Sequence, residues 1–334
     1  MHSDMASAVL KLSNITKKFG HKTVLDNVNL DINSGEIFGI IGLSGSGKTT
    51  LLNTMIGSLR PNYGDVLFKI EHLLNYRDDK SQYRSVYKNE TDVKKAFGFA
   101  AQTPSFYNKL TPIENLRYFG KLYELSSDII NTNSEILLQL MGIADSKNLI
   151  SGYMSGGMKK RLDIACALIH DPKILILDEP TSDLDPINRK QMWALIRQIN
   201  EKGTTIILSS HFLDELEGLC DRVGILYNGQ VICAGTPNEV KSIYTKEDEI
   251  RLETSPGKYQ KIMERISKES KLQIKKMFIQ DNRLVLYTSK PERGLHEVLH
   301  ILEQMGELLI DVSVNKPSLQ EVLEKLIQGH KVVK

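Results

Sequence analysis

An eight-residue stretch rich in glycine, Gly42-Leu43-Ser44-Gly45-Ser46-Gly47-Lys48-Thr49, has the residue types and spacing of a phosphate-binding loop. Its glycines allow the backbone to wrap so that several N–H groups point at phosphate oxygens, and a helix beginning after Gly47 would add its dipole. Lys48 would place a positive charge on the outer phosphates, and the Thr49 hydroxyl is a suitable ligand for Mg²⁺. The pattern therefore predicts a site for a phosphorylated ligand, with a purely structural glycine turn as the weaker alternative.

Two adjacent carboxylates, Asp178 and Glu179, follow the apolar run Ile174–Leu177. Ligands of parallel α/β sheets bind at the carboxyl ends of the strands, where this pair would stand. Asp178 would hold Mg²⁺ directly or through water, and Glu179 could act as a general base toward an attacking water. A solvated turn is the alternative, which the phosphate-binding loop in the same chain disfavours.

Four further positions could serve such a site, each with a structural alternative. Ser155-Gly156-Gly157 could be an ordinary helix N-cap or a second anion-binding helix N-terminus, which would then serve the nucleotide of a neighbouring subunit. His211 follows a strand-like run and could act at the same sheet edge, although most lone histidines are structural. Gln102 could reach Mg²⁺ or the attacking water. The ring of Phe19 could stack on a base or pack in the core.

Continuous apolar runs should place these residues on one edge of a parallel sheet. Runs without alternation are typical of strands buried on both faces, and each run here is followed by a turn and a helical pattern. Because the carboxyl ends of parallel strands meet at one edge, the candidate residues should lie together there. The sequence predicts an α/β domain with strands Ile37–Gly42, Ile174–Asp178 and Thr204–Ser209 and helices Lys48–Ile56, Pro186–Asn200 and Phe212–Cys220.

A change of composition between Tyr244 and Asp248 marks a second domain. Beyond it the charge density rises and the elements shorten, in the order β-α-β-β-α-β-α, which suits a small ferredoxin-like α+β module. We therefore expect one domain at 1–244 and a C-terminal accessory domain at 245–334. Its expected elements are strands Glu249–Glu253, Gln273–Ile279, Arg283–Thr288 and Leu308–Val314, helices Lys258–Ser267, Glu292–Gln304 and Leu319–Ile327, and a hairpin turn at Asp281-Asn282.

One segment of the first domain, Leu73–Lys95, is polar and shows little apolar periodicity. Its tyrosines and charged residues predict a solvated surface insertion, because such a stretch has few side chains to place in a core. A partner-docking arm is the alternative.

Composition excludes several classes of protein. The 334 residues include 43 Lys and Arg against 41 Asp and Glu, so no strong global field would recruit nucleic acid or anionic lipid. No run approaches the 18 or so apolar residues that a membrane-spanning helix needs. The three cysteines lack the spacing of a disulfide framework or a zinc site. With no secretory pattern at the N-terminus, these features predict a cytosolic protein.

In their order and spacing, these motifs resemble the ATP-binding cassette family along Leu10–Val240. Phe19 falls at the adenine-stacking position of that family, Gly42–Thr49 matches its Walker A loop, and Gln102 matches the glutamine of its Q-loop. Ser155-Gly156-Gly157 matches the signature motif, and Asp178 with Glu179 matches Walker B. Ser182-Asp183-Leu184-Asp185 matches the D-loop, and His211 matches the switch histidine. The combination is far more specific than any one of these motifs alone.

The resemblance implies a P-loop NTPase fold with a helical subdomain at about 103–170, and hydrolysis of ATP with Mg²⁺. It further implies that two subunits, identical or different, close head-to-tail on two ATP molecules and pair with a membrane-embedded permease at the inner face of the cell membrane, without nucleic acid. The residues it assigns are Phe19, Gly42, Leu43, Ser44, Gly45, Ser46, Gly47, Lys48, Thr49, Thr50, Ser155, Gly156 and Gly157 to the nucleotide, Thr49, Gln102 and Asp178 to the metal, and Glu179, His211 and Gln102 to catalysis.

Looser patterns in Phe106–Leu122 and Pro317–Val322 resemble the daunorubicin-resistance type of drug, lipid and polysaccharide exporter, which implies export. Two positions depart from the family: Met158 stands where the signature usually has glutamine, and Asp183 where the D-loop usually has a small residue. The alternatives are an importer ATPase with a regulatory C-terminal domain, a soluble cassette without a transport role and a non-hydrolysing regulatory partner.

Overall fold

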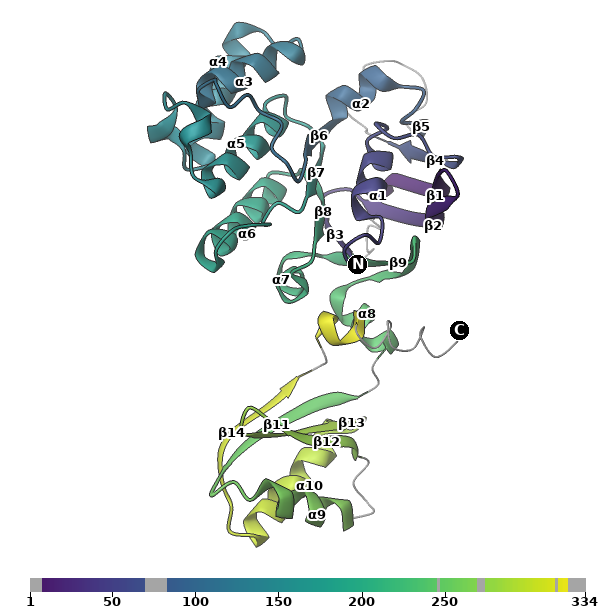
Figure 1. The fold of residues 1–334 in the computed structure, drawn as a ribbon, viewed down its shortest axis with the longest axis vertical. Coiled ribbons are helices and arrows are strands. Elements are labelled where there is room, and N and C mark those ends of the chain that lie inside the picture. The colour runs from purple at the N-terminus through teal and green to yellow at the C-terminus, as the bar shows by residue number, and fades with distance from the viewer. Residues whose placement is uncertain (1–7, 70–82, 245–246, 269–273, 316–317, 324–334) are drawn as a thin grey trace, which may run out of the picture. The chain divides into compact units, whose positions relative to one another are not determined.

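Contacts within the chain divide it into two units, Met1–Thr236 and Pro237–Lys334, each of which is described by itself below (Figure 1). The computed structural model describes residues 8–69, 83–244, 247–268, 274–315 and 318–323. Helix α8 (Pro237–Tyr244) falls in the second unit, so the contacts divide the chain slightly ahead of the composition change. Of the described helices, none is both long and apolar enough to cross a membrane.

A six-stranded sheet forms the centre of the first unit and confirms the α/β class. Its strands lie in the order β10 (Gln230–Gly235), β9 (Arg222–Tyr227), β3 (Ile37–Ile41), β8 (Thr205–Ser210), β7 (Ile174–Asp178) and β6 (Phe97–Ala100). All neighbouring pairs are parallel except β10 with β9. Every residue of β3, β7 and β8 is buried, as their continuous apolar runs predicted. The pairing of β7 with β8 sets Asp178 opposite Ser209.

A second, antiparallel sheet covers helix α1 (Lys48–Met55) from the other side. Its order is β2 (Lys22–Asn33), β1 (Ala8–Phe19), β4 (Tyr63–Phe68) and β5 (Arg84–Ser85). One apolar cluster joins Leu10 of β1, Leu51 of α1 and Ile176 of β7, so α1 is packed between the two sheets. The loop that precedes α1 is therefore held by a rigid core on both sides.

The segment expected as a solvated insertion is partly built into this core. Residues 70–82 lie outside the described residues, but the remainder contains β5 and helix α2 (Glu90–Ala96). Val86 and Val93 are buried in the same apolar cluster. The expectation of a solvated Leu73–Lys95 is therefore wrong for its second half, because isolated valines among polar residues gave no recognisable periodicity.

Helices α3 (Pro112–Leu122), α4 (Ser127–Leu140) and α5 (Gly156–Leu168) lie together at one side of the first unit, within the stretch where a helical subdomain is expected (Figure 1). Short 3₁₀ turns at Ala144–Ser146 and Ser151–Tyr153 connect α4 to α5. Helices α6 (Pro186–Glu201) and α7 (Leu213–Leu219) follow β7 and β8. A Cβ atom on Gly98 of β6 would lie 2.3 Å from the carbonyl oxygen of Ala167, so the end of α5 rests directly on the sheet.

The second unit carries a four-stranded antiparallel sheet in the order β12 (Ile274–Gln280), β13 (Arg283–Thr288), β11 (Asp248–Ser255) and β14 (Leu308–Asn315). Helices α9 (Tyr259–Lys268) and α10 (Pro291–Gln304) bury one face of it around Ile250 and Leu286. The expected succession of elements is present, including the turn at Asp281-Asn282, where both φ angles are positive. Of the expected closing helix, residues 319–323 are helical and the rest lies outside the described residues.

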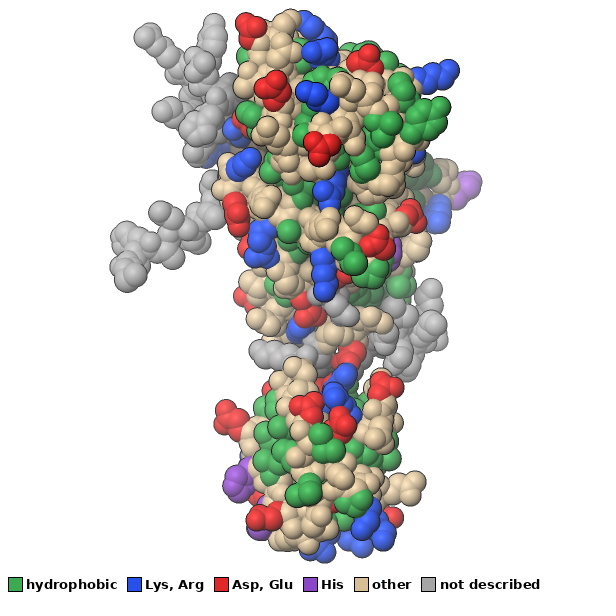
Figure 2. Space-filling view, turned by 90° about the vertical axis from the view of Figure 1, so that its left-hand side faces the viewer, with side chains coloured by type: hydrophobic (Ala, Val, Ile, Leu, Met, Phe, Trp, Pro, Cys, Tyr) green, Lys and Arg blue, Asp and Glu red, His purple; other side chains and the backbone are tan. Residues whose placement is uncertain are grey.

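The two outer strands of this sheet differ in character. β12 exposes Lys275 and Lys276. β14 exposes Leu308, Leu309, Ile310, Val312 and Val314, and its one charged residue, Asp311, is paired with Arg283 at 3.3 Å. On the face shown in Figure 2, basic and acidic side chains are interspersed over each unit, as the nearly neutral composition predicted.

Candidate functional site

The phosphate-binding loop lies between β3 and α1, where the sequence predicted it. Gly47 is the N-cap of α1 with φ of 106°, a left-handed conformation that glycine adopts without strain. A Cβ atom on Gly42 would lie 2.5 Å from the carbonyl oxygen of Leu226, so a larger residue would displace the neighbouring strand. These two glycines explain why this turn can bring its backbone close to a ligand.

Lys48 extends from the first turn of α1 into the loop. Its ammonium donates to the carbonyl oxygens of Gly42 at 2.9 Å and Leu43 at 3.2 Å, and lies 3.8 Å from Oε1 of Glu179. Burial lowers the pKa of Lys48, while the nearby carboxylates of Glu179 and Asp178 act in the opposite direction. The side chain is 7% exposed, so its charge acts in a region of reduced solvent screening.

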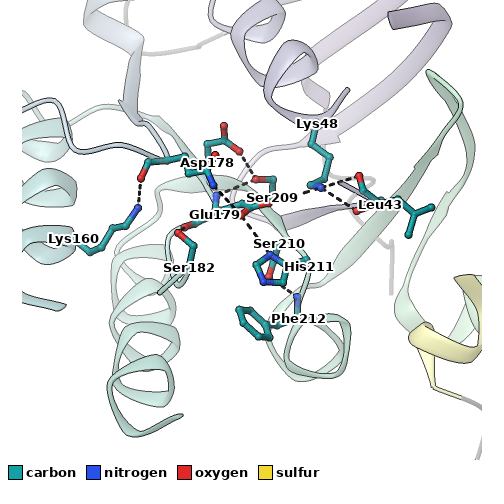
Figure 3. A network of polar contacts seen from close by, with 12 residues as sticks. Leu43, Lys48, Lys160, Asp178, Glu179, Ser182, Ser209, Ser210, His211 and Phe212 are labelled. Carbon is teal, nitrogen blue, oxygen red and sulfur yellow. Dashed lines mark hydrogen bonds and ion pairs between the residues drawn. The ribbon is translucent and has the colours of Figure 1, made fainter. Parts of the chain in front are cut away.

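The carboxylates at the end of β7 are held by a serine on the next strand (Figure 3). Ser209 Oγ donates to Asp178 Oδ1 at 2.6 Å and accepts from the backbone N–H of Glu179 at 3.0 Å. Glu179 has φ of 48°, an uncommon conformation for a residue with a side chain. The Ser182 hydroxyl donates to the carbonyl oxygen of Glu179 at 2.9 Å, which fixes the other side of this strained residue.

Three polar side chains from separate elements converge on the Glu179 carboxylate. Gln102, just after β6, approaches Oε2 through Nε2 at 3.4 Å, and His211, just after β8, approaches the same oxygen through Nδ1 at 3.4 Å. Lys48 lies near Oε1. The predicted meeting of strand ends at one sheet edge is therefore what brings these residues together. A carboxylate between a lysine, a histidine and an amide suits general base chemistry beside a phosphate.

A cavity of about 540 Å³ opens in front of this carboxylate, large enough for a nucleotide. Its described lining is Val24, Ser44, Gly45, Gly47, Lys48, Thr49, Thr50, Gln102, Glu179 and His211. Leu43 and Ser46 face a second cavity of about 310 Å³ on the other side of the loop, which shares Val24, Ser44 and Gly45 with the first. Most of the predicted residues are thus assembled around one loop.

Phe19 and the stretch Ser155-Gly156-Gly157 lie outside the lining of both cavities, as do Gly42 and Asp178. Phe19, at the end of β1, is 51% exposed, and the ammonium of Lys17 lies 5.2 Å from its ring centre. Ser155 is the N-cap of α5, where its hydroxyl accepts from the N–H of Met158 at 3.3 Å. Ser155 and Gly156 are exposed. An exposed helix N-terminus is available to an anion that comes from outside this chain.

Sequence reasoning missed Ser209, Val24 and Lys160. Ser209 became visible only through the pairing of β7 with β8, since it stands 31 positions from Asp178 in the chain. Val24 lies on β2, which no motif marks, yet it contributes to both cavities. Lys160 is buried, and its ammonium donates to the carbonyl oxygen of Gln102. The basic run at 159–161 was the only sequence signal for it.

The oxygen-bearing side chains at the site suit Mg²⁺. Thr49 and Gln102 line the cavity, and Asp178 is buried directly before Glu179, which also lines it. These are hard donors, and Mg²⁺ commonly binds one or two protein ligands together with phosphates and water. The described residues hold no group of three or more His, Cys, Asp and Glu side chains of the kind that binds softer metals.

Comparison with known proteins places this geometry in a family. The model of the ABC transporter family matches residues 25–182. The bacitracin transport ATP-binding protein BcrA of Bacillus licheniformis is 30% identical over 324 residues, 97% of this chain and 98% of BcrA. The daunorubicin resistance ATP-binding protein DrrA3 of Streptomyces coeruleorubidus is 28% identical over 99% of both chains.

Other relatives match about two thirds of this chain. The probable multidrug ABC transporter ATP-binding protein YbhF of Escherichia coli is 36% identical over 234 residues, so this chain spans only 38% of YbhF. One similar solved structure is a dimer of the ATP-binding cassette MJ0796 in a post-hydrolysis state with ADP and phosphate. The match covers 68% of this chain and 98% of the MJ0796 chain, with a TM-score of 0.57 and 29% sequence identity. BcrA and DrrA3 match nearly the whole chain, and together with the family model they show that the chain belongs to the ABC transporter family, as an ATP-binding protein.

Proposed function

We propose that this chain binds and hydrolyses ATP and thereby powers the export of a drug-like or antibiotic compound through a separate membrane permease. The observation that carries the proposal is the convergence of Lys48, Gln102 and His211 on Glu179 at the mouth of the phosphate-loop cavity. Export is favoured over import because the relatives that match nearly the whole chain are named for bacitracin transport and daunorubicin resistance.

In this proposal the loop residues 42–50 bind the phosphates, with Lys48 neutralising charge on the outer ones. Mg²⁺, held by Thr49, Asp178 and Gln102, would neutralise charge on the phosphate oxygens during transfer. Glu179 orients a water molecule and accepts its proton, and its strained backbone is kept in place by Ser209 and Ser182. His211 and Gln102 hold the carboxylate and the water in line with the outer phosphate.

We further propose that the active form contains two ATP-binding subunits, of the same or different kind. The exposure of Ser155 and Gly156 away from the cavity supports a role toward the nucleotide of the other subunit. The dimeric state of the solved relative MJ0796 supports the same arrangement. Phe19, also exposed, would stack on the adenine ring, which requires a displacement of the Lys17 side chain from its face.

We place the protein at the cytoplasmic face of the cell membrane, attached through its permease. The mixed charges of Figure 2 support a protein partner and not nucleic acid, for which a basic surface would be expected. The domain boundary is proposed at 244/245. The C-terminal module is proposed to be ferredoxin-like, because its sheet order β12-β13-β11-β14 and its two helices on one face agree with that topology.

The roles of Lys48 and Glu179 are tested by substitution in the full chain. Lys48→Ala should abolish binding of ATP measured by equilibrium dialysis. Glu179→Gln should bind ATP like the unaltered protein but release phosphate at least about 10²-fold more slowly, since a positioned base is lost. Lys173→Ala, at an exposed lysine outside the site, is the matched control. Unimpaired phosphate release by Glu179→Gln would refute the proposed catalysis.

A further inference from the structure

Helix α5 carries a buried lysine and a buried aspartate that do not line the nucleotide cavity. Lys160 is 8% exposed and Asp163 is 2% exposed. They are three residues apart, so they lie on the same side of the helix, one turn from each other. Ionised groups are unfavourable in an interior unless they are paired, which calls for an explanation of both.

Lys160 reaches the backbone that carries Gln102. Its ammonium donates to the Gln102 carbonyl oxygen. Burial lowers the pKa of Lys160, while four carboxylates act in the opposite direction: those of Asp163, Asp183, Asp178 and Glu179. The lysine is therefore stabilised by the same acidic residues that surround the catalytic site.

Asp163 holds the same segment of backbone three residues further on. Its Oδ1 accepts from the backbone N–H of Ser105 at 2.8 Å and from the Ser105 hydroxyl at 3.1 Å. Its Oδ2 is buried and has no hydrogen-bond partner among the described residues. A buried carboxylate with only one hydrogen-bonded oxygen lowers the free energy of unfolding. The contact with Ser105 therefore explains the position of Asp163 better than stability alone.

We propose that Lys160 and Asp163 are positioning residues that fasten the segment Gln102–Ser105 to helix α5, so that Gln102 moves together with Ser155. Ser155 caps the same helix five residues before Lys160, which is about 7.5 Å along a helix axis. At the other end of the chain of contacts, Gln102 Nε2 lies 3.4 Å from Glu179. Binding of a second subunit's nucleotide at Ser155 thereby places the amide at this chain's own catalytic carboxylate.

This inference rests on the proposed ATPase function and on its use of two subunits. The inference predicts kinetic effects of losing Lys160 that a purely structural role of this residue would not produce. If Lys160 acts through Gln102, its loss lowers kcat and leaves ATP binding at Lys48 unchanged, since Lys160 lies outside the cavity lining. In addition, once Gln102 is removed, the further loss of Lys160 has no effect on turnover.

The test is a double-mutant cycle of Lys160→Met and Gln102→Ala in the full chain, followed by kcat and KM for ATP. Lys160→Met should lower kcat at least about tenfold with KM within about twofold, and the double variant should turn over no more slowly than Gln102→Ala. Lys159→Met is the matched control, since Lys159 neighbours Lys160 on α5 but is less buried, and its side chain makes no hydrogen bond or ion pair with the described residues. Effects that multiply in the double variant, or a Lys160→Met rate equal to that of Lys159→Met, would overturn the inference.

A second measurement keeps the test valid if Lys160→Met folds poorly or the unaltered protein hydrolyses no ATP. Asp163→Ala removes the acceptor of the Ser105 amide, and amide hydrogen exchange of a peptide spanning 102–106 should then be at least about fivefold faster at an unchanged melting temperature. Unchanged exchange would show that α5 does not hold this segment. Absence of hydrolysis by the unaltered protein would instead contradict the proposed function.

Discussion

Replacement of Ser209 by alanine is a sharp test of how the catalytic carboxylates are held. The hydroxyl is completely buried, donates to Asp178 and accepts from the N–H of Glu179. Alanine removes both contacts and almost no volume. Neither Asp178 nor Glu179 is altered chemically, so any effect arises from their placement.

The expected magnitude follows from the two contacts. A hydrogen bond to a charged group contributes roughly 1.5–3 kcal/mol, and a buried donor left without an acceptor costs about 1–3 kcal/mol. The free energy of unfolding of the first unit should therefore fall by about 3–4 kcal/mol. Because Glu179 has a positive φ that its neighbours must maintain, the carboxylate should also move, and kcat should fall at least about tenfold.

Urea unfolding followed by tryptophan fluorescence measures the stability, because Trp193 is the only tryptophan and belongs to α6 of the first unit. Ser210→Ala is the matched control: Ser210 is the next buried residue of β8, and within the described parts of the chain its hydroxyl accepts only from the N–H of Phe212, at 3.0 Å. That variant should lose about 1 kcal/mol. If Ser209→Ala loses no more than Ser210→Ala and keeps its ATPase rate, Ser209 does not position the carboxylates.

Three further predictions concern other parts of the chain. Burial raises the pKa of Asp163 to about 6 from 3.8. The part of the free energy of unfolding that comes from its neutral form is therefore complete below about pH 4 and lost as the pH rises through about 6. Asp163→Asn should flatten this part of a urea-unfolding pH profile, and an unchanged profile would contradict the prediction. Added to the Glu179→Gln variant, Met158→Gln should lower the ATP concentration at which the protein dimerises on a sizing column, because an amide offers polar contacts that a thioether lacks. A weaker dimer would count against this prediction. A chain ending at Tyr244 should bind ATP normally but associate less with its partner subunit or permease in co-purification, whereas loss of ATP binding in a folded truncation would show that the units depend on each other.

Local patterns were sufficient for the elements that place the loop and the carboxylates. The runs before Gly42, Asp178 and His211 are continuous, so both their strand character and their burial could be predicted. Parallel pairing then brought their carboxyl ends together without knowledge of the strand order. The second unit was predictable for the same reason, since each of its elements has its own periodicity and turn residues.

Contacts that depend on register or on packing between distant elements could not be predicted. Ser209 is one polar residue in an apolar run until β8 is aligned with β7. In the sequence Lys160 is one of three consecutive basic residues, and only the packing of α5 against the segment after β6 shows that it is buried. Val93 was overlooked because a single apolar residue in a polar segment does not form a pattern, although the core has room for it.

The unequal outer strands of the C-terminal sheet limit how copies of this chain can join by strand pairing. In the described part of the sheet, β14 offers a row of exposed apolar side chains, whereas β12 exposes one isoleucine, Ile279, beside two lysines: Lys276, and Lys275, which pairs with Glu247 at 2.6 Å. A filament requires two complementary edges on each copy, but a pair needs only one edge used twice. Strand pairing through β14 alone would therefore end at two copies, with the charged side chains of β12 at the opposite edge.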